Sequence, residues 1–179
     1  MRRLLLILLA PLLVLGLATS ALAAPHFVGK NAQPVCTVSI TGGTSSTVCK
    51  GELAGLGNED LLIDTQVEGF AIYQCQNRGG HRPPGQNKVL VGPITEPTTI
   101  DSAAIKNGRV QFVTNPAVLS APATVTSAEA GCPNPNYTGV NPTLTVTSVT
   151  TTISQGGAVL FTCRASDPNG LSGTVVLTC

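Results

Sequence analysis

Apolar and polar side chains alternate along residues 61–75, LLIDTQVEGFAIYQC, with the period of two that is typical of a β-strand with one buried face. The predicted buried face consists of Ile63, Thr65, Val67, Ala71, Tyr73 and Cys75. The opposite face is mostly polar, but it also carries Phe70 and Ile72, which we expect another element to cover. Gly69 lies within this strand and indicates a β-bulge.

Further strands are expected at residues 88–92, 109–114, 143–153 and 159–165. Asn107-Gly108 and Gly156-Gly157 are turn signals that precede two of them. Between 143 and 153 the apolar positions change phase, which indicates a second bulge near Ser148. Apart from one short turn at 102–106, the sequence after the leader lacks helical periodicity. Many short strands between turns predict an all-β fold: an antiparallel β-sandwich, Ig-like, with its strand order left open.

The first 23 residues have the features of a cleaved signal peptide. Arg2 and Arg3 precede an apolar run, and Ala21-Leu22-Ala23 offers the small side chains that a signal peptidase requires. A membrane anchor is the alternative, but the apolar run is shorter than the roughly 20 residues of a spanning helix. We therefore predict a secreted, extracellular protein with one domain at 24–179 and no membrane insertion after cleavage.

The charge of the chain argues against nucleic acid as a partner. Loss of Arg2 and Arg3 leaves 8 of the 10 basic residues against 9 acidic ones, a net charge of −1. A nearly neutral surface gives no long-range attraction towards nucleic acid or anionic lipid.

Six cysteines follow the predicted cleavage site, and an even number in an exported chain predicts disulfides. A zinc site is the alternative, but the paired Cys-x-x-Cys or Cys/His spacing of such sites is absent. The segment VCTVSITGGTSSTVCK predicts a hairpin centred on Gly42-Gly43 that places Cys36 opposite Cys49. In that hairpin Val38 should face Thr47, and Ile40 should face Ser45.

The carboxyl-terminal segment FTCRASDPNGLSGTVVLTC predicts a second hairpin. Its expected turn is Pro168-Asn169-Gly170, and Cys163 should lie near Cys179. A long-range Cys75–Cys132 bridge then remains. The predicted framework is therefore Cys36–Cys49, Cys75–Cys132 and Cys163–Cys179.

Catalytic chemistry has little support, and we expect no enzyme activity. A Ser-His-Asp arrangement needs a histidine held between a hydroxyl and a carboxylate, and no acid is close to His81 in sequence. Asp64 and Glu68 share a strand face, but four residues of strand separate them by roughly 13 Å, too far for paired carboxylates. We predict no cofactor and no metal.

Residues 76–88, QNRGGHRPPGQNK, form the one long polar connection that carries several charges. Loops of this length in a compact domain are usually functional or mobile. The Cys75–Cys132 bridge should bring this loop beside the CPNPN segment at one end of the sandwich. Arg78, His81, Arg82 and Lys88 form a tentative binding loop for an unknown extracellular protein or a small anionic ligand, with a plain connector as the alternative.

Five segments resemble stretches that recur in a family of small exported bacterial proteins of uncharacterised function: HFVGKNA, CKGELAGLGNED, PPGQNK, IKNGRVQF and CPNPNYT. The resemblance spans most of residues 26–146. It implies export, a β-rich body and one bacterial family. Because that family has no assigned activity, the resemblance implies no catalytic or ligand-binding residues.

Three functions are compatible with these features. The first is a secreted, non-enzymatic interaction module with an unknown extracellular or cell-surface ligand. The alternative is a secreted proteinase inhibitor that presents Arg78 or Arg82 on a disulfide-anchored loop. The third is an extracellular hydrolase, which needs a carboxylate brought to His81 by the fold.

Overall fold

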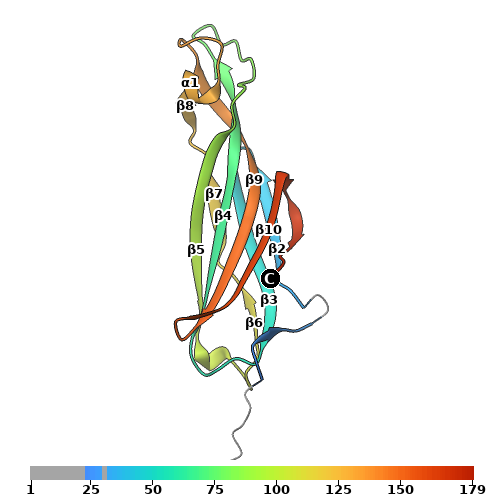
Figure 1. The fold of residues 1–179 in the computed structure, drawn as a ribbon. Helices are drawn as coiled ribbons and strands as arrows, with labels where there is room; N and C mark the ends of the chain where they lie inside the picture. The colour runs from blue at the N-terminus through green and yellow to red at the C-terminus, as the bar shows by residue number, and fades with distance from the viewer. Residues whose placement is uncertain (1–22, 30–31) are drawn as a thin grey trace, which may run out of the picture.

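The computed structural model describes residues 23–29 and 32–179, so the predicted signal peptide lies outside the described residues except for Ala23. The chain forms two antiparallel sheets that pack face to face (Figure 1). The predicted all-β sandwich is confirmed. The Ig-like assignment stays a prediction.

The first sheet is built on two long strands that pair along almost their whole length. Its strand order is β10-β9-β4-β5, and β8 pairs with the start of β9. The bounds are β4 (Leu61–Gln76), β5 (Val89–Ile100), β8 (Thr124–Thr126), β9 (Thr138–Gln155) and β10 (Ala158–Leu171). The predicted strand at 88–92 therefore continues to Ile100, through Pro93 and Pro97.

The second sheet has β3 at its centre. On one side β3 pairs with β2, which in turn pairs with β11, and on the other side it pairs with β6 and β7. The short β1 pairs with the carboxyl end of β3. The bounds are β1 (His26–Phe27), β2 (Val35–Thr41), β3 (Thr44–Ala54), β6 (Val110–Val113), β7 (Ala117–Ser120) and β11 (Gly173–Val176).

Strand β4 follows its predicted pattern, and all six residues of the predicted inner face are buried. The register slips at Gly69 against both neighbouring strands, so the predicted bulge is confirmed. The Lys88 ammonium group lies 4.3 Å from the ring centre of Phe70, whereas Ile72 is exposed, so the expected cover is wrong for Ile72. In β9 the pairing skips Thr147, which confirms the bulge next to Ser148.

The three disulfides join the pairs that the sequence predicts: Cys36–Cys49, Cys75–Cys132 and Cys163–Cys179. The first hairpin has the predicted register, with Val38 opposite Thr47 and Ile40 opposite Ser45. The second predicted hairpin is wrong. Pro168-Asn169-Gly170 is an irregular stretch inside β10, and the chain then crosses to β11, which pairs with β2 of the other sheet. The backbone groups of β11 are thus satisfied by β2 rather than by β10.

Cys163 and Cys179 nevertheless meet, because the residues beyond β11 return to β10. The N–H of Arg164 donates to the carbonyl of Thr178 at 2.8 Å, and the N–H of Thr178 donates to the carbonyl of Arg164 at 3.0 Å. The third disulfide therefore ties the two sheets together.

The described residues also contain two short helical segments. A 3-10 turn at Ser102–Ala104 matches the predicted short turn. The helix α1 (Ser127–Ala130) was not predicted, although its capping box is present in the sequence. Thr126 caps the Glu129 N–H, the Glu129 carboxylate accepts from the Thr126 N–H, and Gly131 ends the helix with φ 67°.

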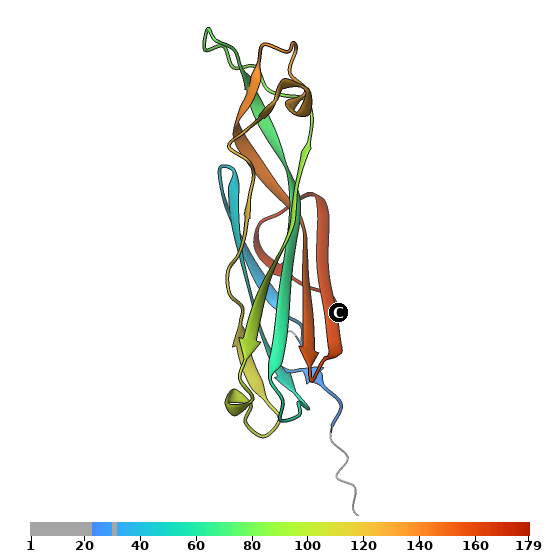
Figure 2. The same cartoon turned by 90° about the vertical axis from the view of Figure 1, so that its left-hand side faces the viewer.

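The molecule is elongated because β4 and β9 extend beyond the second sheet (Figures 1 and 2). Together with β8, α1 and the loop before β5, their ends form a projection that we call the distal tip, residues 72–88 and 122–142. One buried cluster runs from Val38 and Val67 in the sandwich to Tyr73 and Ala130 in the tip. No helix among the described residues is long and apolar enough to cross a membrane.

Candidate binding groove at the distal tip

The polar loop of residues 77–88 is fastened to the edge of β4. The Cys75 N–H donates to the Pro83 carbonyl at 2.7 Å, and the Gly85 N–H donates to the Tyr73 carbonyl at 2.7 Å. Residues 83–85 therefore act as an extra strand beside β4. The tip is thus a small sheet in the order 83–85, β4, β9, β8.

The helix α1 holds the same loop from the other direction. The N–H groups of Gln86 and Asn87 both donate to the Ala130 carbonyl, at 3.0 and 3.2 Å. The Asn87 side chain donates to the Ala128 carbonyl at 3.1 Å. Gly85 is needed here, because a Cβ at this position would lie 2.5 Å from the Ala130 oxygen. The loop is therefore an ordered part of the tip.

One face of the tip sheet is a small core under α1. A Cβ on Gly139 would touch Val125, Ala130 and Tyr73, which shows how closely these elements approach one another. Tyr73 is 1% exposed, and its hydroxyl donates to the Pro122 carbonyl at 2.8 Å. Burial, with a smaller contribution from the negative charge of Glu129, raises the pKa of Tyr73 above its ordinary value.

The helix cap lies at the edge of this core. The Thr126 hydroxyl donates to the Glu129 carboxylate at 2.7 Å, and the Thr126 N–H donates to it at 2.9 Å. These two hydrogen bonds lower the pKa of Glu129 below its usual range. Glu129 is the one carboxylate of the tip, and it is already engaged in this cap.

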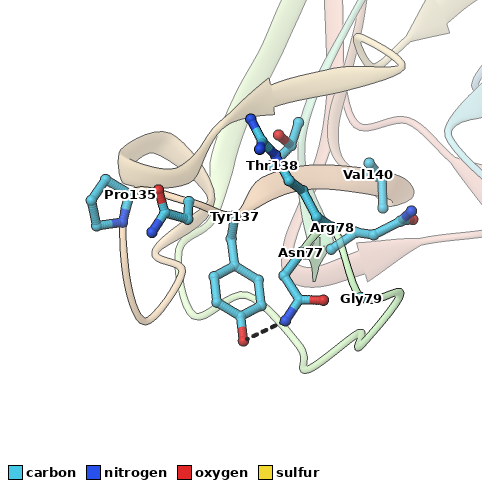
Figure 3. Close-up of a pocket in the computed structure, with 9 residues that line it drawn as sticks. Asn77, Arg78, Gly79, Pro135, Tyr137, Thr138 and Val140 are labelled. Carbon is cyan, nitrogen blue, oxygen red and sulfur yellow. Dashed lines mark hydrogen bonds between the residues drawn. The ribbon is translucent and has the colours of Figure 1, made fainter.

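The opposite face of the tip sheet is hollowed into an open groove of about 790 Å³ (Figure 3). Gln76 and Thr138, which pair across β4 and β9, form its floor together with Val140. Its two walls are the residues 77–79 and 135–137. These walls follow Cys75 and Cys132, so the disulfide brings the two loops together, as the sequence predicts.

Asn77 fixes the shape of the first wall and links it to the second. Its side-chain oxygen accepts from the His81 N–H at 3.0 Å, and its carbonyl accepts from the Gly80 N–H at 3.0 Å. Its side-chain amide donates to the Tyr137 hydroxyl at 3.4 Å (Figure 3). Because Tyr137 accepts this bond, its own hydroxyl hydrogen stays free to donate into the groove.

The groove is rich in hydrogen-bond donors, and no carboxylate lines it. The donors are the Arg78 guanidinium, the side-chain amides of Gln76 and Asn136, and the hydroxyls of Tyr137 and Thr138. Within residues 23–29 and 32–179, Arg78 forms no ion pair. A guanidinium among neutral donors is a favourable environment for an anion.

The four residues of the predicted binding loop do not form one cluster. Arg78 lines the groove, whereas the ring of His81 has no hydrogen bond or ion pair with a carboxylate in the described part of the chain. Arg82 is exposed on the return of the loop. Lys88 lies over Phe70 on the outer face of the first sheet. Arg78 therefore lies at the groove and Lys88 lies away from it, and the binding role of the loop stays a prediction.

The sequence places the CPNPN segment, and with it Pro135 and Asn136, beside the loop, but it does not indicate Tyr137 as part of the second wall. The expected Cys75–Cys132 bridge is the signal that points to this wall, since Tyr137 follows Cys132 closely. Local sequence could not show that Tyr137 turns towards Asn77.

Charge is distributed unevenly along the molecule. In the tip, three cations (Arg78, Arg82 and Lys88) stand against the single carboxylate of Glu129. Elsewhere in the described residues there are four cations, Lys50, Lys106, Arg109 and Arg164, against eight carboxylates. The distal tip is therefore the positive end of an otherwise acidic surface.

No family model matches this chain, and no curated protein matches its sequence. The resemblance to exported bacterial proteins accordingly stays a prediction.

Proposed function

We propose that this chain is a secreted, non-enzymatic binding module whose ligand presents an anionic group to the groove of the distal tip. The observation that carries the proposal is the lining of the groove: Arg78 stands among neutral donors, and no carboxylate competes for it. The three disulfides and the signal-peptide pattern support an extracellular location.

A carboxylate suits this lining in shape as well as in charge. A guanidinium can donate two parallel hydrogen bonds to one carboxylate, and neighbouring amides and hydroxyls can hold the rest of the ligand. The acidic surface away from the tip repels the same ligand, so the charge asymmetry favours arrival at the tip.

Isothermal titration with galacturonate tests the proposal, with galactose as a neutral analogue of the same size. We expect galacturonate to bind and galactose to bind at least tenfold more weakly. Arg78→Gln should weaken galacturonate binding by roughly 10- to 100-fold, because hydrogen bonds to a charged group contribute about 1.5–3 kcal/mol.

Lys106→Gln is the matched control, since it removes an exposed cation far from the groove and should leave binding unchanged. Equal binding of galacturonate to the Arg78→Gln and Lys106→Gln variants would contradict the proposal.

A proteinase-inhibitor function has weaker support. Arg78 lies inside the tight turn closed by the Gly80 N–H and the Asn77 carbonyl, and its side chain lines a hollow instead of standing on a convex loop. Residual trypsin activity with excess protein tests this alternative directly. A hydrolase function gains no support, because no carboxylate contacts His81 among the described residues.

A further inference from the structure

The pairing beside β4 places a second arginine next to the groove, although it is not one of the residues that line it. Cys75 and Pro83 form a hydrogen-bonded pair, and so do Asn77 and His81, whose N···O distance is 3.3 Å. Residue 76 must therefore stand directly opposite residue 82, in a non-hydrogen-bonded pair with Cα atoms about 4.5 Å apart. Side chains that stand opposite each other lie on the same face of the sheet.

Gln76 forms part of the groove floor, so Arg82 stands beside that floor, at the edge of the tip sheet. Across the tip sheet, on the face that carries the groove, the residues that stand side by side are then Arg82, Gln76, Thr138 and Thr126. Arg78 lies beyond the end of β4, in the turn that the Gly80 N–H and the Asn77 carbonyl close. Like Arg78, Arg82 has no ion pair within the described residues.

A single carboxylate can occupy one guanidinium in a bidentate pair, which leaves the other guanidinium without a partner. Two free guanidinium groups beside one groove therefore suit a ligand that carries two anionic groups. The floor between them offers an amide and hydroxyls, from Gln76 and Thr138, which match the hydroxyl groups of a sugar ring. Tyr137 adds an amphipathic ring on the wall.

An acidic peptide suits the groove less well. Extended peptides gain much of their affinity by adding a strand to an exposed sheet edge. Here the β4 edge of the tip is already covered by residues 83–85, and the groove lies on the face of the sheet.

We propose that the groove binds an acidic saccharide chain, with one carboxylate held by Arg78 and a second held by Arg82. This inference rests on the proposed function, because it assumes that the groove takes an anion at Arg78. It adds the class of ligand and a second anion subsite.

Titration with galacturonate, digalacturonate and triglutamate tests the proposal on the whole secreted domain. Wild-type protein should bind digalacturonate at least tenfold more tightly than galacturonate, which exceeds the twofold statistical effect of a second identical group. Arg82→Gln should abolish this gain, so that digalacturonate and galacturonate bind with similar affinity. Arg78→Gln should weaken both saccharides, and Lys106→Gln should weaken neither.

The outcomes separate the two proposals. If Arg82→Gln leaves digalacturonate binding unchanged while Arg78→Gln weakens both saccharides, the second subsite is wrong and the proposed function stands. If Arg78→Gln changes nothing, both are wrong. Tighter binding of triglutamate than of digalacturonate would overturn the saccharide assignment in favour of a peptide. Unchanged thermal melting of each variant shows that its fold is intact.

Discussion

Tyr73 is the largest side chain in the small core of the distal tip. It is buried at 1% exposure on the inner face of β4, and its hydroxyl donates across to the Pro122 carbonyl in the segment that leads into β8. A buried tyrosine with a satisfied hydroxyl combines a large apolar contact with a directional bond. Substitution of Tyr73 by phenylalanine removes the hydroxyl and keeps the ring.

We expect Tyr73→Phe to lower the free energy of unfolding by about 1 kcal/mol, the usual net contribution of one hydrogen bond. Urea denaturation at neutral pH measures this. Tyr137→Phe is the matched control. Among the described residues the Tyr137 hydroxyl takes part in one 3.4 Å hydrogen bond, from Asn77 at the groove wall, so its removal should lower the free energy of unfolding by less. An equal loss of unfolding free energy in the two variants would contradict a stabilising role for the hydrogen bond of the Tyr73 hydroxyl.

The raised pKa of Tyr73 adds a pH dependence of known sign. A group whose pKa is higher in the folded state stabilises fully below its unfolded pKa, near pH 10, and loses that contribution as the pH rises through the folded value. The stability difference between wild type and Tyr73→Phe should therefore shrink above about pH 10.

At the same scale, the sequence predicts the buried positions of β4 well, because alternation depends only on neighbours in the chain. It does not indicate that Tyr137 lies beside the loop of Arg78, because the contact between Tyr137 and Asn77 depends on two loops that only the fold brings together.

The two long strands β4 and β9 are kept in register by a close approach at the bulge. A Cβ on Gly69 would lie 2.1 Å from the Thr145 oxygen and 3.0 Å from the Val146 Cα, both backbone atoms that cannot move independently. The bulge therefore depends on the absence of a side chain at residue 69, and the β-strands bend around this position.

Gly69→Ala should destabilise the domain by about 3 kcal/mol, since the added methyl group forces the two strands apart. Chemical denaturation measures the loss. Gly57→Ala is the control, because its Cβ would meet only the flexible Gln155 side chain, at 3.5 Å. A Gly69→Ala variant as stable as Gly57→Ala would show that the strands can slide past each other there.

Elements whose patterns are interrupted were harder to predict. Pro93 and Pro97 interrupt the strand pattern, so the sequence predicts only the first part of β5. The strand tolerates both prolines because β5 is the edge strand of its sheet. Pro168-Asn169-Gly170 has the residues of a hairpin turn, and these residues predict a turn from local sequence alone. Local sequence does not show that β11 pairs with β2 of the other sheet. The helix α1 is too short to show periodicity, although its capping box was readable.

For the molecule as a whole, each disulfide secures a different part. Cys36–Cys49 lies within the second sheet, Cys163–Cys179 ties the two sheets together, and Cys75–Cys132 holds the walls of the tip groove. On the chain-entropy model the two short loops contribute about 3 kcal/mol each and the long one about 4 kcal/mol. Their sum is comparable with the roughly 5–15 kcal/mol stability of a typical domain.

Complete reduction should therefore unfold the domain or abolish its cooperative thermal transition, as followed by circular dichroism with and without a strong reductant. The paired substitution Cys75→Ser/Cys132→Ser should lower the melting temperature by roughly 8–16 °C while retaining a cooperative transition. A melting curve that is unchanged in reductant would contradict this account of stability.

The pairing of β2 with β11 has a consequence for how the chain acquires its fold. Val35 pairs with Val176, so the second sheet cannot be completed until the chain has been synthesised as far as β11. Contacts between residues so distant in sequence make folding slow, because a large loop must close before they form. The second sheet must accordingly stay open until β11 is available to pair with β2, and the domain is finished only then.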